Sequence, residues 1–192
     1  MEIFQAASLK SIRSDLIERL RNGQVAVFPT DTIYGFTADA TNHEAVERIL
    51  ALKRRRTPVS CIPHGVEWAR LLVSQGHRRR FDEHIESYFG RYTTLWPAEQ
   101  GDRVAHPLVQ TDQLVGIRFP DHWIRGLAAE ARLPLTTTSV NRTGQEPMRS
   151  LETLDPELAR GIDFVVDEGV LQNPPSVIVR CDGDEFTELI RE

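Results

Sequence analysis

The fold of this chain is decided by the stretch VAVFPTDTIYGFTADATNHEAVERILALKRRR, residues 25–56. It opens with Val25–Phe28, a short and continuously apolar run that is typical of a strand buried on both faces. Thr41 and Glu44 then form a capping-box pattern, which predicts that an amphipathic helix begins there. A buried strand, a polar loop and such a helix, in this order, indicate an α/β fold. The helix runs into four consecutive cations, although the chain has a net charge of -5.

Periodic apolar patterns predict further elements on both sides of this stretch. Residues 8–22 have the spacing of an amphipathic helix, and residues 97–113 resemble a mobile polar loop. The other predicted helices lie near 66–75, 80–88, 121–132 and 151–160, and the other predicted strands near 92–96, 114–119, 134–138, 162–166, 176–180 and 185–190. Because helices and strands interleave without a strict repeat, we expect a mixed sheet of parallel and antiparallel strands with flanking helices.

Length and composition are those of one globular domain, which we expect to span residues 1–192. The negative net charge argues against a surface built to coat nucleic acid. Cys61 and Cys181 are far apart and lack metal-ligand spacing, so we expect buried, reduced thiols and no protein-bound metal. The chain has no signal-peptide-like start and no run of about 20 apolar residues. We therefore predict a cytoplasmic protein that does not enter a membrane.

Polar segments follow several predicted strands, at the place where ligands of α/β proteins usually bind. In PTDTIYG, Thr30, Thr32 and Tyr34 offer hydroxyl groups beside the carboxylate of Asp31. The alternative is a turn in which the Thr and Asp side chains bond their own backbone. In LPLTTTSVNRTG, residues 133–144, a hydroxyl-rich strand is suited to a polar ligand such as a ribose or a phosphate. There the alternative is an ordinary strand edge that leads into a turn.

Other segments carry positive charge at a helix end or inside a strand. KRRR, residues 53–56, either complements the helix dipole in solvent or clamps a polyphosphate, with Lys as a point charge and Arg as a planar fork. Arg118 interrupts the apolar strand of VGIRFPDH, so it must pair with a carboxylate, reach solvent or face a ligand. The triplet at residues 78–80 is expected at the surface, and a weak contact with tRNA is the alternative. The chain has no P-loop and no dinucleotide-binding glycine motif.

Taken together and in this order, these segments resemble the YrdC-type family of L-threonylcarbamoyl-AMP synthases. The matching pieces are FPTDTIYGFTADATNHEAVERILALKRR, FGRYTTL, VGIRFPDHWIRGLAAEARLPLTTTSVNRTG and PPSVIV. The resemblance implies a twisted mixed sheet around a concave, positively charged cleft. It also implies a nucleotidyltransferase that joins L-threonine, bicarbonate or CO2, and ATP into threonylcarbamoyl-adenylate and pyrophosphate. Mg2+ would arrive with the ATP, and the product would supply proteins that make N6-threonylcarbamoyladenosine in tRNA.

The resemblance also assigns roles to individual residues. The family's KxR motif falls on Lys53 and Arg55, which would neutralise the phosphates of ATP and so act in catalysis. Its SxN motif falls on Ser139 and Asn141, which together with Ser176 would bind the nucleotide. The substrate-binding residues that the remaining motifs imply are Thr30, Thr32, Tyr34, Thr93 and Arg118.

The chain departs from the family's pattern in two places. After KxR, the piece RRRTPVSCIPHG is short and lacks the second lysine of the family's KPL-like piece. At residues 88–93, the usual Trp-Pro-Gly-Pro-Leu-Thr is replaced by Tyr-Phe-Gly-Arg-Tyr-Thr. Two other interpretations stay open. One is a YciO-like paralogue with different carbamoyl-adenylate chemistry, and the other is an RNA-binding module that uses the cleft without catalysis.

Overall fold

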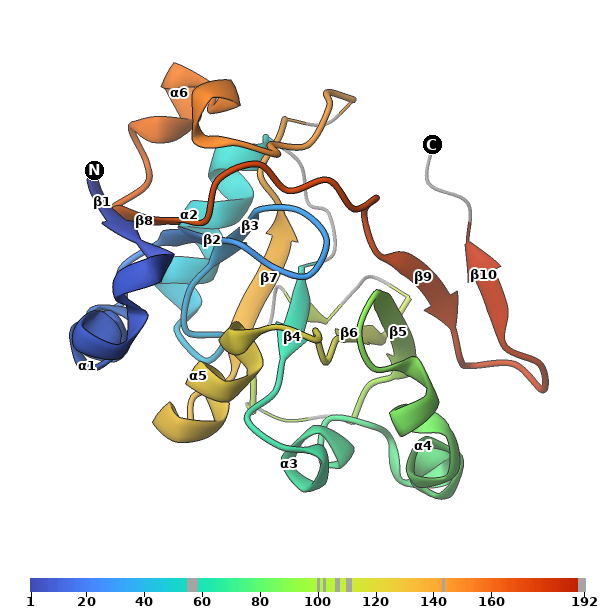
Figure 1. Ribbon diagram of the computed structural model, residues 1–192. Coiled ribbons are helices and arrows are strands. Elements are labelled where there is room, and N and C mark those ends of the chain that lie inside the picture. Colours follow the sequence, from blue (N-terminus) through green and yellow to red (C-terminus); the bar gives the residue numbers. More distant parts are fainter. Residues whose placement is uncertain are drawn as a thin grey trace.

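The computed structural model describes residues 1–54, 59–99, 101, 103–105, 108–109, 112–142 and 144–189. Within this part of the chain a 10-stranded sheet has the order β1-β8-β2-β3-β7-β4-β6-β5-β9-β10 (Figure 1). The strands are β1 (Glu2–Gln5), β2 (Ala26–Phe28), β3 (Gly35–Thr37), β4 (Ser60–Ile62), β5 (Tyr92–Pro97), β6 (Leu114–Ile117), β7 (Leu135–Ser139), β8 (Phe164–Asp167), β9 (Val177–Arg180) and β10 (Thr187–Leu189). The α-helices are α1 (Leu9–Arg21), α2 (His43–Lys53), α3 (Val66–Arg70), α4 (Arg78–His84), α5 (Trp123–Ala131) and α6 (Pro156–Ala159). Short 3-10 turns are η1 (Ala6–Ser8), η2 (Gln75–His77), η3 (Ile85–Tyr88) and η5 (Leu151–Thr153).

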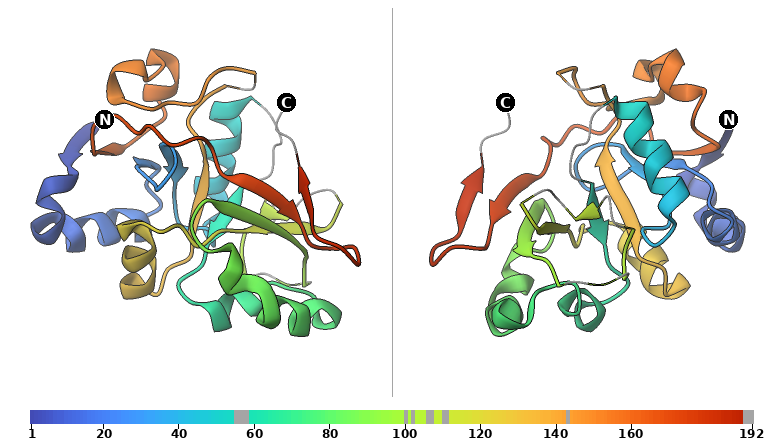
Figure 2. Two further views of the ribbon diagram at one scale, coloured as in Figure 1. Left: turned by 45° about the vertical axis from the view of Figure 1, so that its right-hand side comes forward. Right: turned by 180° about the vertical axis from the view of Figure 1, so that it is seen from behind.

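The sheet mixes parallel and antiparallel neighbours. β1 and β2 both run parallel to β8, β4 runs parallel to β6, and β5 runs parallel to β9. The other neighbouring pairs, including β2 with β3 and β3 with β7, are antiparallel. The views in Figure 2 show that the sheet is twisted, with β9 and β10 swung away from β7 at one edge. The predicted twisted, mixed α/β sheet is therefore confirmed.

Helices cover both faces of the part of the sheet that contains β2 and β8. Ala26 and Phe28 of β2 pack in one core with Leu16 of α1 and Leu127 of α5. Val27 faces the other way and packs in a second core with residues of α2 and α6. The two layers are seen on opposite sides of the sheet in Figure 2. Both faces of β2 are buried, which explains why its sequence is apolar throughout and does not alternate.

The start of α2 differs from the predicted capping box. The helix begins at His43, and the side chain of Asn42 caps it by accepting a hydrogen bond from the Ala45 backbone N–H. Thr41 instead donates its hydroxyl and its backbone N–H to the Asp39 carboxylate, at 2.7 and 2.8 Å. The prediction that Thr41 is the cap was wrong by one residue, because Asp39 already engages it.

The predicted loop at residues 97–113 is partly wrong. Val104, Ala105 and Leu108 are buried in the core formed with α4, β5 and β6. This segment is therefore not polar throughout, because it contributes apolar side chains to the interior. The remaining part of that prediction, on residues 100, 102, 106–107 and 110–111, lies outside the described residues.

Cys61 and Cys181 are buried and form no disulfide, as predicted for reduced thiols. The longest helix of the described residues, α1, has 13 residues, and no helix there combines the length and the apolar character that crossing a membrane requires.

Candidate functional site

Lys53, Ser139 and Asn141 form one cluster at the end of β7. The Lys53 side chain comes from the last turn of α2 and is 5% exposed. Its Nζ donates to the backbone oxygen of Ser139 at 2.6 Å and to the backbone oxygen and Oδ1 of Asn141 at 3.2 and 3.1 Å. Ser139 Oγ donates to Asn141 Oδ1 at 2.6 Å. The ammonium therefore orders the chain where it leaves β7.

The same cluster is tied into the sheet and into the following turn. Ser139 pairs with Gly35 of β3, and Asn141 Nδ2 donates to the backbone oxygen of Gln145 at 2.7 Å. The structure thus brings together three of the residues that we matched to the KxR and SxN motifs. Arg55, the second predicted catalytic cation, lies outside the described residues.

Arg118, Asp31 and Thr32 form a second cluster, over the loop that follows β2. Arg118 is 5% exposed, and its Nη2 donates to Asp31 Oδ1 at 2.5 Å and to Thr32 Oγ1 at 2.8 Å. The second carboxylate oxygen of Asp31 accepts from the Asp121 backbone N–H at 2.9 Å. Of the alternatives that the sequence left open for Arg118, the carboxylate pair is the one found. Burial makes this pair sensitive to loss of either partner, since an uncompensated buried charge is costly.

The predicted hydroxyl groups in this loop are also engaged with their neighbours. Thr30 Oγ1 lies 3.0 Å from Thr32 Oγ1 and donates to the Ile33 backbone oxygen at 2.7 Å. The self-bonded turn that the sequence offered as an alternative is therefore present for Thr30, whereas the Asp31 carboxylate bonds Arg118 and the Asp121 N–H instead. Whether these hydroxyls also contact substrate stays a prediction.

Thr93 of β5 lies beside Ser176, the residue before the parallel strand β9. Their hydroxyl oxygens lie 2.9 Å apart, and both side chains are buried. The contact follows from the register of β5 with β9, in which Thr93 stands opposite Ile178, two residues after Ser176. A predicted substrate residue and a predicted nucleotide residue are thus neighbours, although 83 residues separate them.

Tyr34 is fully buried and has its hydroxyl on the turn after β8. The hydroxyl oxygen lies 2.8 Å from the Gly169 backbone oxygen and 3.1 Å from Asp167 Oδ1, and it accepts from the Glu168 N–H at 2.9 Å. Burial raises the pKa of Tyr34 to about 12. Through these contacts Tyr34 holds the loop after β2 against the turn after β8. Its predicted contact with substrate stays a prediction.

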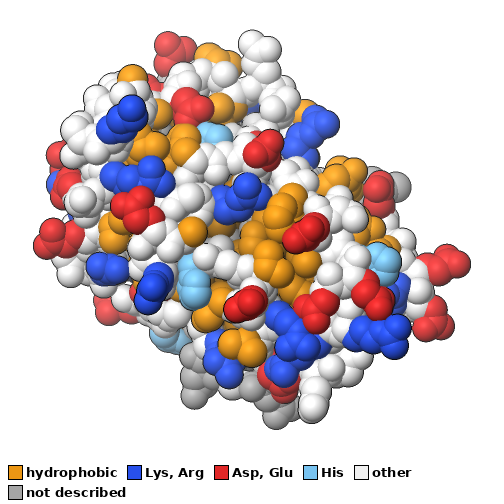
Figure 3. Space-filling view, turned by 60° about the horizontal axis from the view of Figure 1, so that its bottom comes forward, with side chains coloured by type: hydrophobic (Ala, Val, Ile, Leu, Met, Phe, Trp, Pro, Cys, Tyr) orange, Lys and Arg blue, Asp and Glu red, His pale blue; other side chains and the backbone are white. Residues whose placement is uncertain are grey.

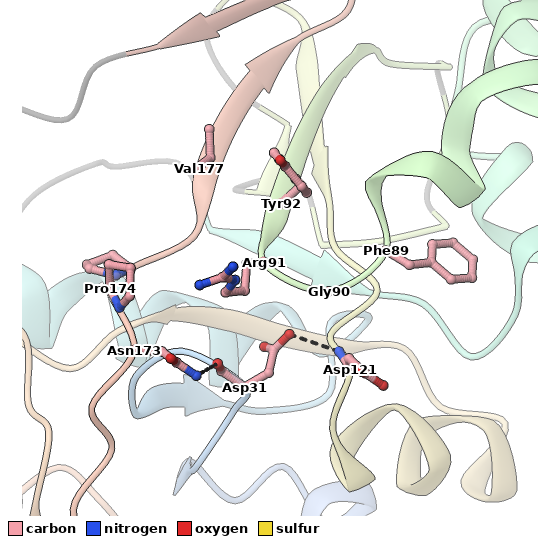
Figure 4. Close-up of a pocket in the computed structure, with 10 residues that line it drawn as sticks. Asp31, Phe89, Gly90, Arg91, Tyr92, Asp121, Asn173, Pro174 and Val177 are labelled. Carbon is pink, nitrogen blue, oxygen red and sulfur yellow. Dashed lines mark hydrogen bonds between the residues drawn. The ribbon is translucent and has the colours of Figure 1, made fainter.

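A cavity of about 730 Å³ opens beside the Arg118–Asp31 cluster. It is lined by Asp31, residues 89–92, Asp121, residues 173–175 and Val177. Figure 4 shows the guanidinium of Arg91 in the open space between two segments. One is the strap before β9, formed by residues 173–175, and the other is the loop before β5, at residues 89–90. Asn173 closes the lower side by donating from Nδ2 to the Asp31 backbone oxygen at 2.9 Å. The cavity thus places charged and polar side chains beside apolar surface from Tyr92 and the prolines.

Sequence reasoning missed His122 and Glu168, which join α5 to the turn after β8. His122 Nε2 lies 3.2 Å from Glu168 Oε2, and the Trp123 indole N–H donates to the same oxygen at 2.8 Å. Burial lowers the pKa of His122, although Glu168 acts in the opposite direction. His122 lies four residues after the predicted site residue Arg118 in VGIRFPDH, but nothing in the sequence indicated its acidic partner, 46 residues away.

The charges on the described surface are mixed. Figure 3 shows Lys and Arg side chains interspersed with Asp and Glu over one face. The basic triplet at 78–80 follows this pattern, since Arg78 pairs with Glu99 and Arg79 with Glu83. The expected basic character of the cleft therefore stays a prediction. Among the residues that the structure describes, no group of three or more His, Cys, Asp or Glu is arranged to hold a metal ion.

Comparisons with known proteins place this geometry in a family. The model of the family Sua5_yciO_yrdC, described as "Telomere recombination", matches residues 18–192. A threonylcarbamoyl-AMP synthase of Vibrio campbellii is 29% identical over 169 residues, which cover 85% of this chain and 90% of that protein. The Sua5 protein of P. abyssi in complex with L-threonine has a TM-score of 0.81 and 21% identity, covering 98% of this chain but only 56% of that one. YciO of E. coli has a TM-score of 0.78 and 22% identity, covering 98% of this chain and 95% of that one. The two structures establish the likeness of the fold.

Proposed function

Because this chain belongs to the Sua5/YciO/YrdC family, we propose that it is a threonylcarbamoyl-AMP synthase. It would join L-threonine, bicarbonate or CO2, and ATP into threonylcarbamoyl-AMP and pyrophosphate. One observation carries the proposal beyond family membership. Lys53 lies 86 and 88 residues from Ser139 and Asn141 in the sequence, and its Nζ is within 3.5 Å of both side chains.

The reaction requires positioning and charge stabilisation more than covalent chemistry by the protein. The amine of threonine adds to CO2 and loses a proton, which forms a carbamate. A carbamate oxygen then bonds to the α-phosphorus of ATP. The bond from that phosphorus to its bridging oxygen breaks, and pyrophosphate leaves with the electron pair. Since both reactants are anions, cations close to them favour their approach.

The individual residues have proposed roles in this scheme. Lys53 and Arg55 would offset the charge of the phosphates, and Mg2+ would enter bound to the phosphates of ATP. Ser139, Asn141 and Ser176 would hold oxygens of the nucleotide. The threonine side of the site would be formed by Thr30, Thr32, Thr93 and Arg118, with Tyr34 supporting the loop. The engagement of Lys53 with the end of β7 supports a second role, since a fixed ammonium also fixes the SxN segment.

The test is incubation of the purified protein with ATP, bicarbonate and L-threonine, followed by mass detection of the adenylate and measurement of pyrophosphate. We expect product only when all three are present, and much less when L-serine replaces L-threonine. The variant Asn141→Ala should lose product formation while its circular dichroism spectrum stays that of the wild type. Failure of the wild-type protein to form the adenylate under any of these conditions would refute the proposal.

A YciO-like activity is the second candidate. The replacement of the family's Trp-Pro-Gly-Pro-Leu-Thr at residues 88–93 favours it, because residues 89–92 of this segment line the cavity. Pyrophosphate release that is independent of threonine and bicarbonate would support this candidate over the synthase. A non-catalytic RNA-binding module would instead bind tRNA tightly at physiological salt, whereas we expect weak tRNA binding that disappears as the ionic strength rises. With the synthase activity, downstream tRNA-modification proteins of the cytoplasm would use the product.

A further inference from the structure

Arg91 is a cation that faces the open cavity. Its side chain is exposed and lines the cavity, and Figure 4 shows the guanidinium pointing into the open space. Among the described residues, its guanidinium forms no ion pair and no hydrogen bond. Many other arginines of this part of the chain do pair, such as Arg78 with Glu99 and Arg180 with Asp182. An arginine in a hollow without a protein partner keeps all its donors for a ligand.

The backbone on either side of Arg91 is fixed, so the guanidinium projects from a rigid base. The Gly90 N–H donates to the Phe119 backbone oxygen at 2.7 Å, and the Arg91 backbone oxygen accepts from the Val177 N–H at 2.9 Å. Gly90 has a φ of 89°, in the left-handed region that favours glycine. This turn directs the following side chain toward the strap at residues 173–175 (Figure 4).

The carboxylates near the cavity do not occupy Arg91. Asp31 bonds Arg118 through one oxygen and the Asp121 backbone N–H through the other. The side chain of Asp121 points away from Arg91 in Figure 4. Tyr92, Pro174 and Val177 add apolar surface to the cavity wall, and Asn173 adds a polar side chain. A planar cation beside apolar walls fits a ligand with an anionic group and a less polar body.

We propose that Arg91 determines substrate binding by contacting an oxyanion of the ligand, a carboxylate or a phosphate. The inference rests on the proposed function, which supplies both kinds of group: the carboxylate of L-threonine and the phosphates of ATP. The less polar part of the ligand lies against Tyr92, Pro174 and Val177. Arg91 stands where the resembled family's motif has a proline, so this contact is a property of this chain.

The experiment measures equilibrium binding without turnover, by calorimetry, with ATP in one arm and L-threonine in the other. The variants are Arg91→Ala, Arg91→Lys and the matched control Arg160→Ala, an exposed arginine at the end of α6 outside the cavity. We expect Arg91→Ala to weaken binding about three- to tenfold in one arm, because the contact is partly open to water. That arm identifies the oxyanion. Arg91→Lys should recover part of the loss, since it keeps the charge without the fork, and Arg160→Ala should bind as the wild type does.

Two further readouts separate a ligand contact from a structural role. The ratio of wild-type to Arg91→Ala affinity should fall as the salt concentration rises, because screening weakens the contact. The melting temperature of Arg91→Ala should equal that of Arg160→Ala. Unchanged affinity of Arg91→Ala in both arms would overturn the inference, as would equal weakening in both arms with a lowered melting temperature. Wild-type protein that binds both ligands but forms no adenylate would refute the synthase alone.

Discussion

Replacing Lys53 with methionine should destabilise the protein and abolish its proposed activity together. Methionine keeps the apolar stem of the side chain and removes the ammonium. The ammonium is buried and donates three bonds of 2.6–3.2 Å, to oxygens of Ser139 and Asn141 at the end of β7. Those oxygens would lose their shared donor in Lys53→Met.

The magnitude follows from the kind of bond and from its surroundings. A hydrogen bond to a charged group contributes about 1.5–3 kcal/mol, and three such bonds would give an upper bound well above the expected effect. Two effects offset part of it: the folded protein no longer has to desolvate an ammonium, and Ser139 and Asn141 are only half-buried, so water can reach them. We expect a loss of about 2–3 kcal/mol in the free energy of unfolding, which for a chain of this size is about 5–10 °C in melting temperature.

Denaturant unfolding and pyrophosphate release should be measured on the same samples of Lys53→Met. The control is Ser139→Ala, which removes only the hydroxyl and leaves the backbone oxygen that accepts at 2.6 Å. It should lose about 1 kcal/mol or less. We expect pyrophosphate release by Lys53→Met to fall at least about a hundredfold, because a displaced nucleotide site reacts poorly. An unfolding free energy of Lys53→Met within about 0.5 kcal/mol of the wild type would refute the reasoning, since that is the range of surface changes.

Two other predictions concern buried hydroxyl groups. Thr93→Val and Ser176→Ala should each lower the unfolding free energy by about 1 kcal/mol, and a double-mutant cycle of denaturant unfolding should give a coupling of about 0.5–1.5 kcal/mol; zero coupling would contradict the 2.9 Å contact. The pKa of Tyr34, raised from 10.0 to about 12 by burial, means that the folded state holds the phenolic proton more tightly than the unfolded state does. Its contribution to stability is therefore fully present below pH 10 and is lost as the pH rises from 10 toward about 12. Tyr34→Phe should show a smaller loss of stability over this interval in urea unfolding, and a slope unchanged from the wild type would contradict the assignment.

The elements that could be predicted from the sequence are those with a clear pattern over several residues. The apolar run of β2 and the periodic spacing of α1 were recognised because burial on defined faces repeats along them. β1, β3 and β4 were not predicted, for physical reasons. β3 (Gly-Phe-Thr) and β4 (Ser-Cys-Ile) lack the continuous apolar run that marks β2, and β1 is mostly exposed. These strands are held by distant partners, such as β3 by β2 and β7, and such pairings leave no local signal.

The candidate site was predictable in its members but not in its contacts. Placing Lys53, Ser139 and Asn141 together required the resemblance, since each residue taken alone could be an ordinary helix end or strand end. No local pattern indicated that Asp31, rather than solvent or a ligand, receives the guanidinium of Arg118, 87 residues away. The cavity itself depends on how the strap before β9 crosses the loop after β2. The Asn173 side chain joins the two segments by donating to the Asp31 backbone oxygen. This is a contact between residues far apart in the sequence, so it leaves no local signal.

The pairing of Arg118 changes which cation can act on a ligand in the cavity. A guanidinium 2.5 Å from a carboxylate forms a dipole, and the field of a dipole falls off faster with distance than that of a single charge. Arg118 therefore holds Asp31 and Thr32 in place more than it attracts an anion. Arg91, which lines the same cavity and has no carboxylate against it among the described residues, exerts the longer-ranged attraction. Loss of Arg118 should therefore lower stability together with affinity for L-threonine, whereas loss of Arg91 should lower affinity with stability unchanged.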